Sequence, residues 1–144
     1  MDRTKLLALV DKIKAAGYSY DTETVLTIEE YFDGNDEAYE NICANNEKPP
    51  STQVMQDFLL SVRAMPSVSD VFVRVYGFED AVAHQDAWIN SDTVFVITSA
   101  SDIEVEEWFR QLTPSEVSEE TRLGRFNNLP AIPEGFRLVA VWWD

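Results

Sequence analysis

The chain has one cysteine, one histidine and five glycines among 144 residues. The lone Cys43 cannot form an internal disulfide, and with His84 as the single imidazole the ligands for a Cys/His zinc site are too few. The glycines form neither a Gly-x-Gly-x-x-Gly motif nor a phosphate-binding loop, and no Gly-x-Ser-x-Gly motif occurs. These absences exclude structural zinc and leave hydrolase, kinase and dinucleotide-binding functions without support.

Basic residues are also scarce: 11 Lys and Arg stand against 26 Asp and Glu, for a net charge of −15. Residues 21–47 hold nine carboxylates and no Lys or Arg. Such a field repels phosphate backbones, so we expect no binding to nucleic acid. It would attract a basic protein or cations. The alternative is that the charge serves only solubility.

Long apolar runs are missing. No stretch reaches the ~18 apolar residues that a membrane helix requires. The N-terminal run "LLALV" is interrupted by Asp11 and Lys12, and no small-residue cleavage site follows it. We therefore expect a cytoplasmic protein without a signal peptide and without a membrane segment.

The apolar content is nevertheless sufficient for a core, at 45% hydrophobic and 12% aromatic residues. A length of 144 residues is typical of one domain. The sequence predicts a single domain over residues 1–144, with an N-terminal helix in 1–17 and an α+β core in 18–144.

Helical spacing of apolar residues predicts three longer helices: within residues 1–17, from Ser51 to Pro66, and from Ser101 to Pro114. Two capping boxes add to this pattern. In such a box the Ser or Thr side-chain oxygen accepts a hydrogen bond from the backbone N–H three residues later. The Glu at that later position accepts a hydrogen bond from the backbone N–H of the Ser or Thr. One at Thr27 predicts a single helical turn that ends at Gly34, and the other, at Ser101, begins the third long helix.

Alternating or continuous apolar residues predict strands at 23–27, 70–78, 92–99 and 136–144, with a short one around Val117. The link over 79–91 is too long for a tight hairpin, and Trp88 and Ile89 in it need a surface to cover. The predicted fold is a two-layer α+β sandwich with an antiparallel sheet of about four strands. A ferredoxin-like (βαββαβ) order with an extra N-terminal helix is one option.

The strongest candidate site is the stretch "TIEEYFDGNDEAYEN", residues 27–41, which has six carboxylates and no Lys or Arg. Its carboxylates could steer a basic partner and its aromatic residues could anchor one, although such aromatics also suit a core. The candidate partner contacts are Tyr31, Phe32, Asp33, Asn35, Asp36, Glu37, Tyr39 and Glu40.

Hard oxygen ligands for calcium or magnesium are also present in this stretch. However, Gly34 directly follows Asp33, which does not fit the spacing of an EF-hand loop. The alternative is a helix that stops at Asp-Gly-Asn, followed by solvated acids. The weak metal candidates are Asp33, Asp36, Glu37 and Glu40.

Two further residues carry reactive chemistry. Asp86 beside His84 would raise the pKa of that imidazole, which would suit a general base, although a solvated surface histidine fits equally. Cys43 follows a run of acids that disfavour a thiolate, so we interpret it as a small buried hydrophobe. We assign no catalytic residue and expect no cofactor.

Four segments together resemble a family of small acidic bacterial proteins known as uncharacterised: "VLTIEEYFDGNDEAYENICAN", "RAMPSVSDVFVRV", "DTVFVITSAS…VEEWF" and "RLVAVWWD". The resemblance covers residues 20–144 and implies a bacterial cytosolic source and a recurring domain, but no activity. In size, acidity and build the chain is also similar to immunity proteins of bacterial toxin systems.

The leading hypothesis is therefore a non-catalytic protein-binding module, immunity-like, with an acidic face for a basic protein. The alternative is an enzyme that depends on a small ligand or divalent metal, with a site near Asp33–Glu40 and His84. The oligomeric state stays open between monomer and homodimer, with the uncovered sheet face or the "VWWD" edge as the interface of a dimer.

Overall fold

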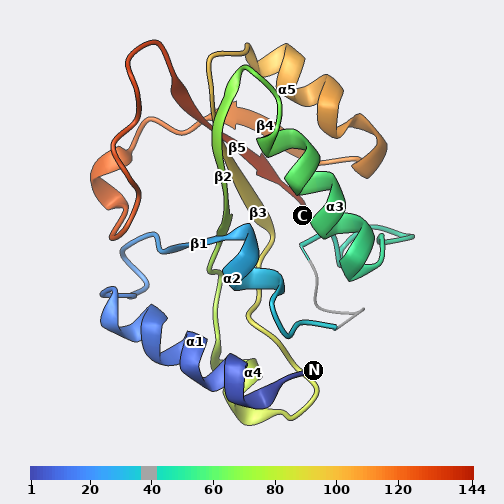
Figure 1. The fold of residues 1–144 in the computed structure, drawn as a ribbon, viewed down its shortest axis with the longest axis vertical. Coiled ribbons are helices and arrows are strands. Elements are labelled where there is room, and N and C mark those ends of the chain that lie inside the picture. Colours follow the sequence, from blue (N-terminus) through green and yellow to red (C-terminus); the bar gives the residue numbers. More distant parts are fainter. Residues whose placement is uncertain (37–41) are drawn as a thin grey trace.

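The computed structural model describes residues 1–36 and 42–144 (Figure 1). It combines helices with a single five-stranded sheet. Along the chain the elements are α1 Arg3–Ala15, β1 Val25–Thr27, α2 Ile28–Phe32, α3 Thr52–Arg63, β2 Val68–Arg74, α4 Glu79–Ala83, β3 Thr93–Thr98, α5 Asp102–Phe109, the 3₁₀ turn η1 Arg110–Leu112, β4 Glu116–Glu119, the 3₁₀ turn η2 Leu123–Arg125 and β5 Arg137–Trp142.

The strands lie in the order β1-β2-β3-β5-β4, and every neighbouring pair is antiparallel. The predicted α+β class and antiparallel sheet are confirmed, with the short strand around Val117 present as β4 at one edge. The ferredoxin-like option is wrong. Its split βαβ unit needs parallel strands on either side of a third, whereas β1 pairs directly and antiparallel with β2, Leu26 opposite Val73.

The helix boundaries follow the capping chemistry in the sequence. Both capping boxes are present: the Thr27 side chain accepts from the Glu30 backbone, the Ser101 side chain from the Glu104 backbone, and each Glu reaches back. Ser51 caps α3 with the first of these two hydrogen bonds, in which its side chain accepts from the Val54 backbone. The third long helix is α-helical only to Phe109 and then tightens into η1.

Because side chains alternate across a strand, each residue of the sheet faces one of two layers. The larger core lies between the sheet and the helices, where α1, α2, α3 and α5 all contribute buried residues. The link over 79–91 closes part of this layer, since Trp88 and Ile89 are fully buried and the Trp88 Nε1 donates to the Tyr31 carbonyl at 2.8 Å.

The opposite face of the sheet is covered only in part. A smaller core of Val25, Phe72, Phe95, Ile97 and Leu138 packs under the segment between β4 and β5. In Figure 1 this orange to red segment lies on the other side of the sheet from α3. The rest of this face, toward the end of β2, is lined by polar groups and leads to the candidate site.

None of the helices in the described residues is long and apolar enough to cross a membrane.

Candidate functional site

The described part of the acidic stretch is held by internal ion pairs. Its Glu37, Tyr39 and Glu40 lie outside the described residues. Each of the other carboxylates has a cationic partner elsewhere in the chain: Glu29 pairs with Arg63, Glu30 with Lys12, Asp33 with Lys5 and Asp36 with the N-terminal amine of Met1.

These pairs leave their mark on the titration of the stretch. Two hydrogen bonds from Arg63, at 2.8 and 2.6 Å, lower the pKa of Glu29 to about 2. The N-terminal amine lowers the pKa of Asp36, and Asp33 raises that of Lys5. Burial opposes ionisation of Glu30, but hydrogen bonds from Lys12 and Thr27 outweigh it and lower its pKa.

The aromatic residues of the stretch belong to the core. Tyr31 and Phe32 are buried and meet edge to face at 4.9 Å, and Asn35 is also buried. Among the candidate partner contacts that the structure describes, Asp33 and Asp36 are the exposed ones. A partner contact through this stretch therefore remains a prediction that rests on these two and on the three residues outside the described ones.

The other two candidates from the sequence, Cys43 and His84, differ in their exposure to solvent. Cys43 is buried, as expected, and burial raises the pKa of its thiol to about 12. His84 is exposed after α4, and its carbonyl accepts from Arg3 at 3.1 Å. Among residues 1–36 and 42–144, no three His, Cys, Asp or Glu side chains gather as metal ligands would.

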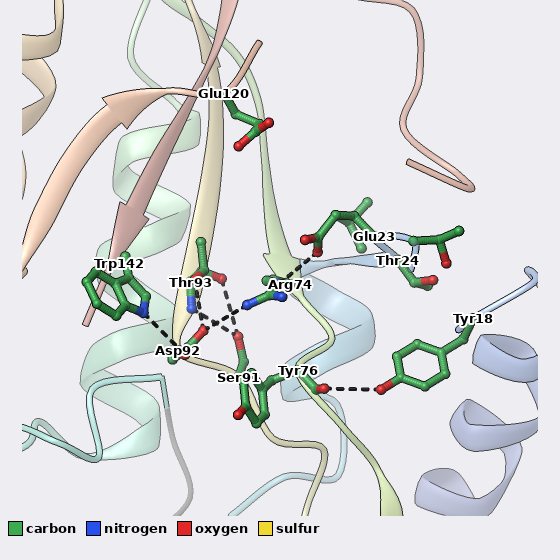
Figure 2. Close-up of polar contacts among 12 residues, drawn as sticks. Tyr18, Glu23, Thr24, Arg74, Tyr76, Ser91, Asp92, Thr93, Glu120 and Trp142 are labelled. Carbon is green, nitrogen blue, oxygen red and sulfur yellow. Dashed lines mark hydrogen bonds and ion pairs between the residues drawn. The ribbon is translucent and has the colours of Figure 1, made fainter. Parts of the chain in front are cut away.

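A different polar centre forms around Arg74, at the end of β2 (Figure 2). Its Nε donates to Glu23 Oε2 at 2.7 Å, and its Nη1 lies 3.5 Å from Asp92 Oδ1. The guanidinium also lies over the ring of Tyr76, 5.6 Å from the centroid. All three charged side chains are more than two-thirds buried, so the pair of carboxylates largely neutralises a shielded cation.

The network continues from Asp92 into the sheet. The Thr93 hydroxyl donates to Asp92 Oδ1 at 2.8 Å, and the Trp142 indole donates to Oδ2 at 3.3 Å. Figure 2 shows these side chains converging from the ends of different strands. Arg74 is therefore held by Glu23, which precedes β1, and by Asp92 at the start of β3, and Asp92 is in turn held by Trp142 at the end of β5.

Two hollows meet at Arg74. The first, which we name the tyrosine hollow, has a volume of about 350 Å³ and is lined chiefly by Tyr18, Tyr20, Tyr76, Glu79, Asp80 and Asn90. The second, the sheet groove, has a volume of about 390 Å³ and includes Thr93, Phe95, Trp142, Glu120, Arg122 and Arg125.

Hydrogen bonds orient the walls of the tyrosine hollow. The Tyr20 hydroxyl donates to Glu79 Oε1 and the Asn90 amide to Asp80 Oδ2, both at 3.1 Å. The Tyr18 hydroxyl donates to the Tyr76 carbonyl, also at 3.1 Å. In the part of the chain that the structure describes, the buried Asn90 Oδ1 has no hydrogen-bond donor.

The wall of the tyrosine hollow has more negative than positive side chains, Glu79 and Asp80 against Arg74. Burial and then the charge of Glu79 raise the pKa of Tyr18, whereas Arg74 opposes that rise without cancelling it. The hydrogen bond to Glu79 raises the pKa of Tyr20. The charges of the hollow thus favour cations over anions, even with a guanidinium in its wall.

The sheet groove is balanced by comparison. Arg74, Arg122 and Arg125 face it together with Glu23, Glu116 and Glu120. Arg122 pairs with Glu120 at 3.0 Å and lowers the pKa of that carboxyl. Three positive and three negative side chains balance one another in the groove, so it offers no excess charge of one sign to a ligand.

Sequence reasoning missed the Arg74 centre. It assigned no functional role to the tyrosines of "GYSYD" or to Arg74, which lies within the predicted strand over residues 70–78. The available signals were two tyrosines in a polar turn, which had no core position to fill, and a lone arginine within an apolar strand. Nothing in the spacing indicates that these two segments come together.

Comparison with known proteins identifies the family. The chain is 33% identical over 125 residues to the protein of Escherichia coli (strain K12) described as uncharacterized protein YfbO, a match that covers 83% of this chain and 82% of that protein. No solved structure matches. The expected membership in an uncharacterised bacterial family is confirmed: residues 4–141 match the family described as "Uncharacterized protein YfbO family", and the chain belongs to it.

Proposed function

We propose that this protein is a non-catalytic binding module for a basic protein, in the manner of an immunity protein. The observation that carries the proposal is the charge left over after internal pairing. Among the described residues, fourteen carboxylate side chains make no ion pair, against four cationic ones. The surface therefore presents a strong excess of unpaired negative charge.

Exposed aromatic rings supply the second requirement of a protein interface. Tyr20 is 85% exposed and Tyr76 is 59% exposed. Tyrosine is enriched at interface hot spots because its ring adds apolar contact area and its hydroxyl adds a hydrogen bond. Both rings stand at the tyrosine hollow beside Glu79 and Asp80, so anchors and negative charge coincide there.

Contacts of the Arg74 centre and of Glu79 hold the side chains of this surface in place before a partner binds. Arg74 lies over the Tyr76 ring, and the Glu79 carboxylate holds the Tyr20 hydroxyl. Side chains fixed before association lose less rotational freedom when a partner docks. The tyrosine hollow thus favours a rigid, preformed contact.

The acidic stretch can take part in the same function. Asp33 and Asp36 are more than half exposed although they are paired. Exposed ion pairs contribute only about 0–1 kcal/mol each. A partner could therefore replace Lys5 or the N-terminal amine with its own cations at little cost.

The test is capture of a partner from a lysate of the bacterial source by the immobilised protein. We expect a stoichiometric basic protein at low salt, and loss of this protein at high salt because screening weakens the attraction. A double variant Glu79→Gln/Asp80→Asn should bind the partner more weakly. The control Glu106→Gln/Glu116→Gln removes the same amount of charge from α5 and β4 and should bind like the wild type.

Two results would overturn the proposal. One is that no basic protein is captured in stoichiometric amount at low salt. The other is that the captured protein binds with the same affinity at all salt concentrations and to all variants, since its recognition would then not depend on charge.

A further inference from the structure

We propose that the tyrosine hollow is a binding site for one Lys or Arg side chain of the partner. This inference rests on the proposed function and adds the chemical group that the site recognises. The recognised group is an ammonium or guanidinium at the end of an apolar stem.

The walls of the hollow match such a side chain in shape and surface. Its volume of about 350 Å³ is open to solvent beside Tyr20 and Tyr76, the two most exposed tyrosines named above. Aromatic faces attract cations through the quadrupole of the ring, and they also cover an alkyl stem. The chain already uses this contact nearby, because Arg74 lies over Tyr76 and Lys14 lies 5.5 Å from the centroid of Phe78.

Acceptors for the charged end stand in the same place. Glu79 accepts from the Tyr20 hydroxyl and from the Phe78 backbone at 3.1 Å, and Asp80 accepts from Asn90. An ionised carboxylate has about four lone-pair positions, so each retains capacity for a partner's donor. Within the described residues neither carboxylate is in an ion pair.

Asn90 adds an acceptor that the free protein leaves unused. Its Oδ1 is shielded from solvent and has no donor among the described residues, while its Nδ2 is engaged by Asp80. A buried acceptor without a donor is unfavourable, and a small rotation of the amide toward an incoming N–H would recover part of that cost. Asn90 therefore favours a ligand that donates hydrogen bonds.

Arg74 does not reverse the preference for a cation. Its charge is taken up by Glu23 and Asp92, which lie on the side of the sheet groove and at the start of β3. At the hollow itself the carboxylates of Glu79 and Asp80 outnumber the single guanidinium of Arg74. A second copy of this chain is a poor occupant, since two surfaces of net charge −15 repel each other.

The experiment uses a matched pair of probes with the intact protein. N-acetyl-arginine amide carries the guanidinium, and N-acetyl-citrulline amide has nearly the same shape without the charge. We expect the arginine probe to shift the NMR resonances of the Tyr20 and Tyr76 rings and of the Asn90 amide, and the citrulline probe to leave them unchanged. Equal shifts with both probes, or no shift at these residues, would overturn the site.

Variants then connect the site to the partner. Tyr20→Ala should weaken partner binding roughly two- to fivefold, the value of one exposed cation–π contact, and Glu79→Gln should weaken it by a similar factor. Ile103→Ala is the control, because Ile103 is 78% exposed on α5, away from the hollow. Tyr20 and Glu79 are surface residues, and an unchanged melting temperature would show that each variant is folded.

The two proposals fail in different ways. If a basic partner is captured but Tyr20→Ala and Glu79→Gln bind it like the wild type, the site is wrong and the proposed function stands. If the arginine probe binds at the hollow but no basic protein is captured, the proposed function is wrong and the cation site stands.

Discussion

Replacement of Arg74 by Met tests whether the Arg74 centre stabilises the fold. The guanidinium lies between Glu23 and Asp92, and all three side chains are more than two-thirds buried. Methionine keeps most of the stem but removes the charge, so two shielded carboxylates lose their counterion. The charge-assisted hydrogen bond to Glu23 contributes about 1.5–3 kcal/mol and the contact with the Tyr76 ring about 0.5–1 kcal/mol.

We therefore expect Arg74→Met to lower the free energy of unfolding by about 2–4 kcal/mol, measured by urea denaturation. For a protein of this size that loss corresponds to a melting temperature lower by roughly 4–16 °C. The double variant Arg74→Met/Glu23→Gln should recover part of the loss, because it no longer leaves Glu23 charged without a partner. A loss below about 0.5 kcal/mol, the range of an ordinary surface substitution, would refute the reasoning.

Four further measurements follow from the structure. Because Arg63 holds the pKa of Glu29 at about 2, Glu29→Gln should lower the free energy of unfolding by at most about 1 kcal/mol above pH 4.5. The difference in unfolding free energy between variant and wild type should vanish as the pH falls through 2. A difference that grows in acid would contradict the ion pair. The buried Cys43 thiol should react with a disulfide reagent only at the rate of unfolding, and fast reaction of the native protein would show that it is accessible. Gly34→Ala should destabilise the protein by about 1–3 kcal/mol, because the φ of Gly34 is +84° and the new Cβ would lie 3.0 Å from Asp2 Cβ. Gly124→Ala is the control: the space around Gly124 is open, so this variant should be neutral in the same urea denaturation assay. Moderate salt should raise the melting temperature of the isolated protein, because screening relieves the repulsion among its unpaired carboxylates; a lower melting temperature would show that the internal pairs dominate instead.

The elements that sequence predicted correctly are those fixed by local chemistry. The capping boxes at Thr27 and Ser101 depend on residues three apart, and helix geometry brings such residues together in any fold. The alternating strands and the buried Trp88 follow from hydrophobic pattern alone. The α+β class could be predicted because it depends only on which elements occur.

Strand order and the candidate site could not be predicted, because both depend on distant segments. The partner of Arg74 in the ion pair, Glu23, lies 51 residues away in the chain, and no period or motif links the two. The acidic stretch was misleading for the same reason. It has no Lys or Arg within itself, yet its described carboxylates are paired with cations from α1, from α3 and from the N-terminus.

The use of the few cations within the fold explains why an acidic surface remains. Seven of the cationic side chains form ion pairs within the described residues, and five of these join separate parts of the chain: Lys5, Lys12, Arg63, Arg74 and Arg137. With 26 acidic residues, pairing most of the bases internally leaves the outward charge almost wholly negative. A chain selected only for solubility would not need exposed tyrosines beside that charge. The coincidence of the two at the tyrosine hollow is what favours a basic partner over solvent as the reason for the acidity.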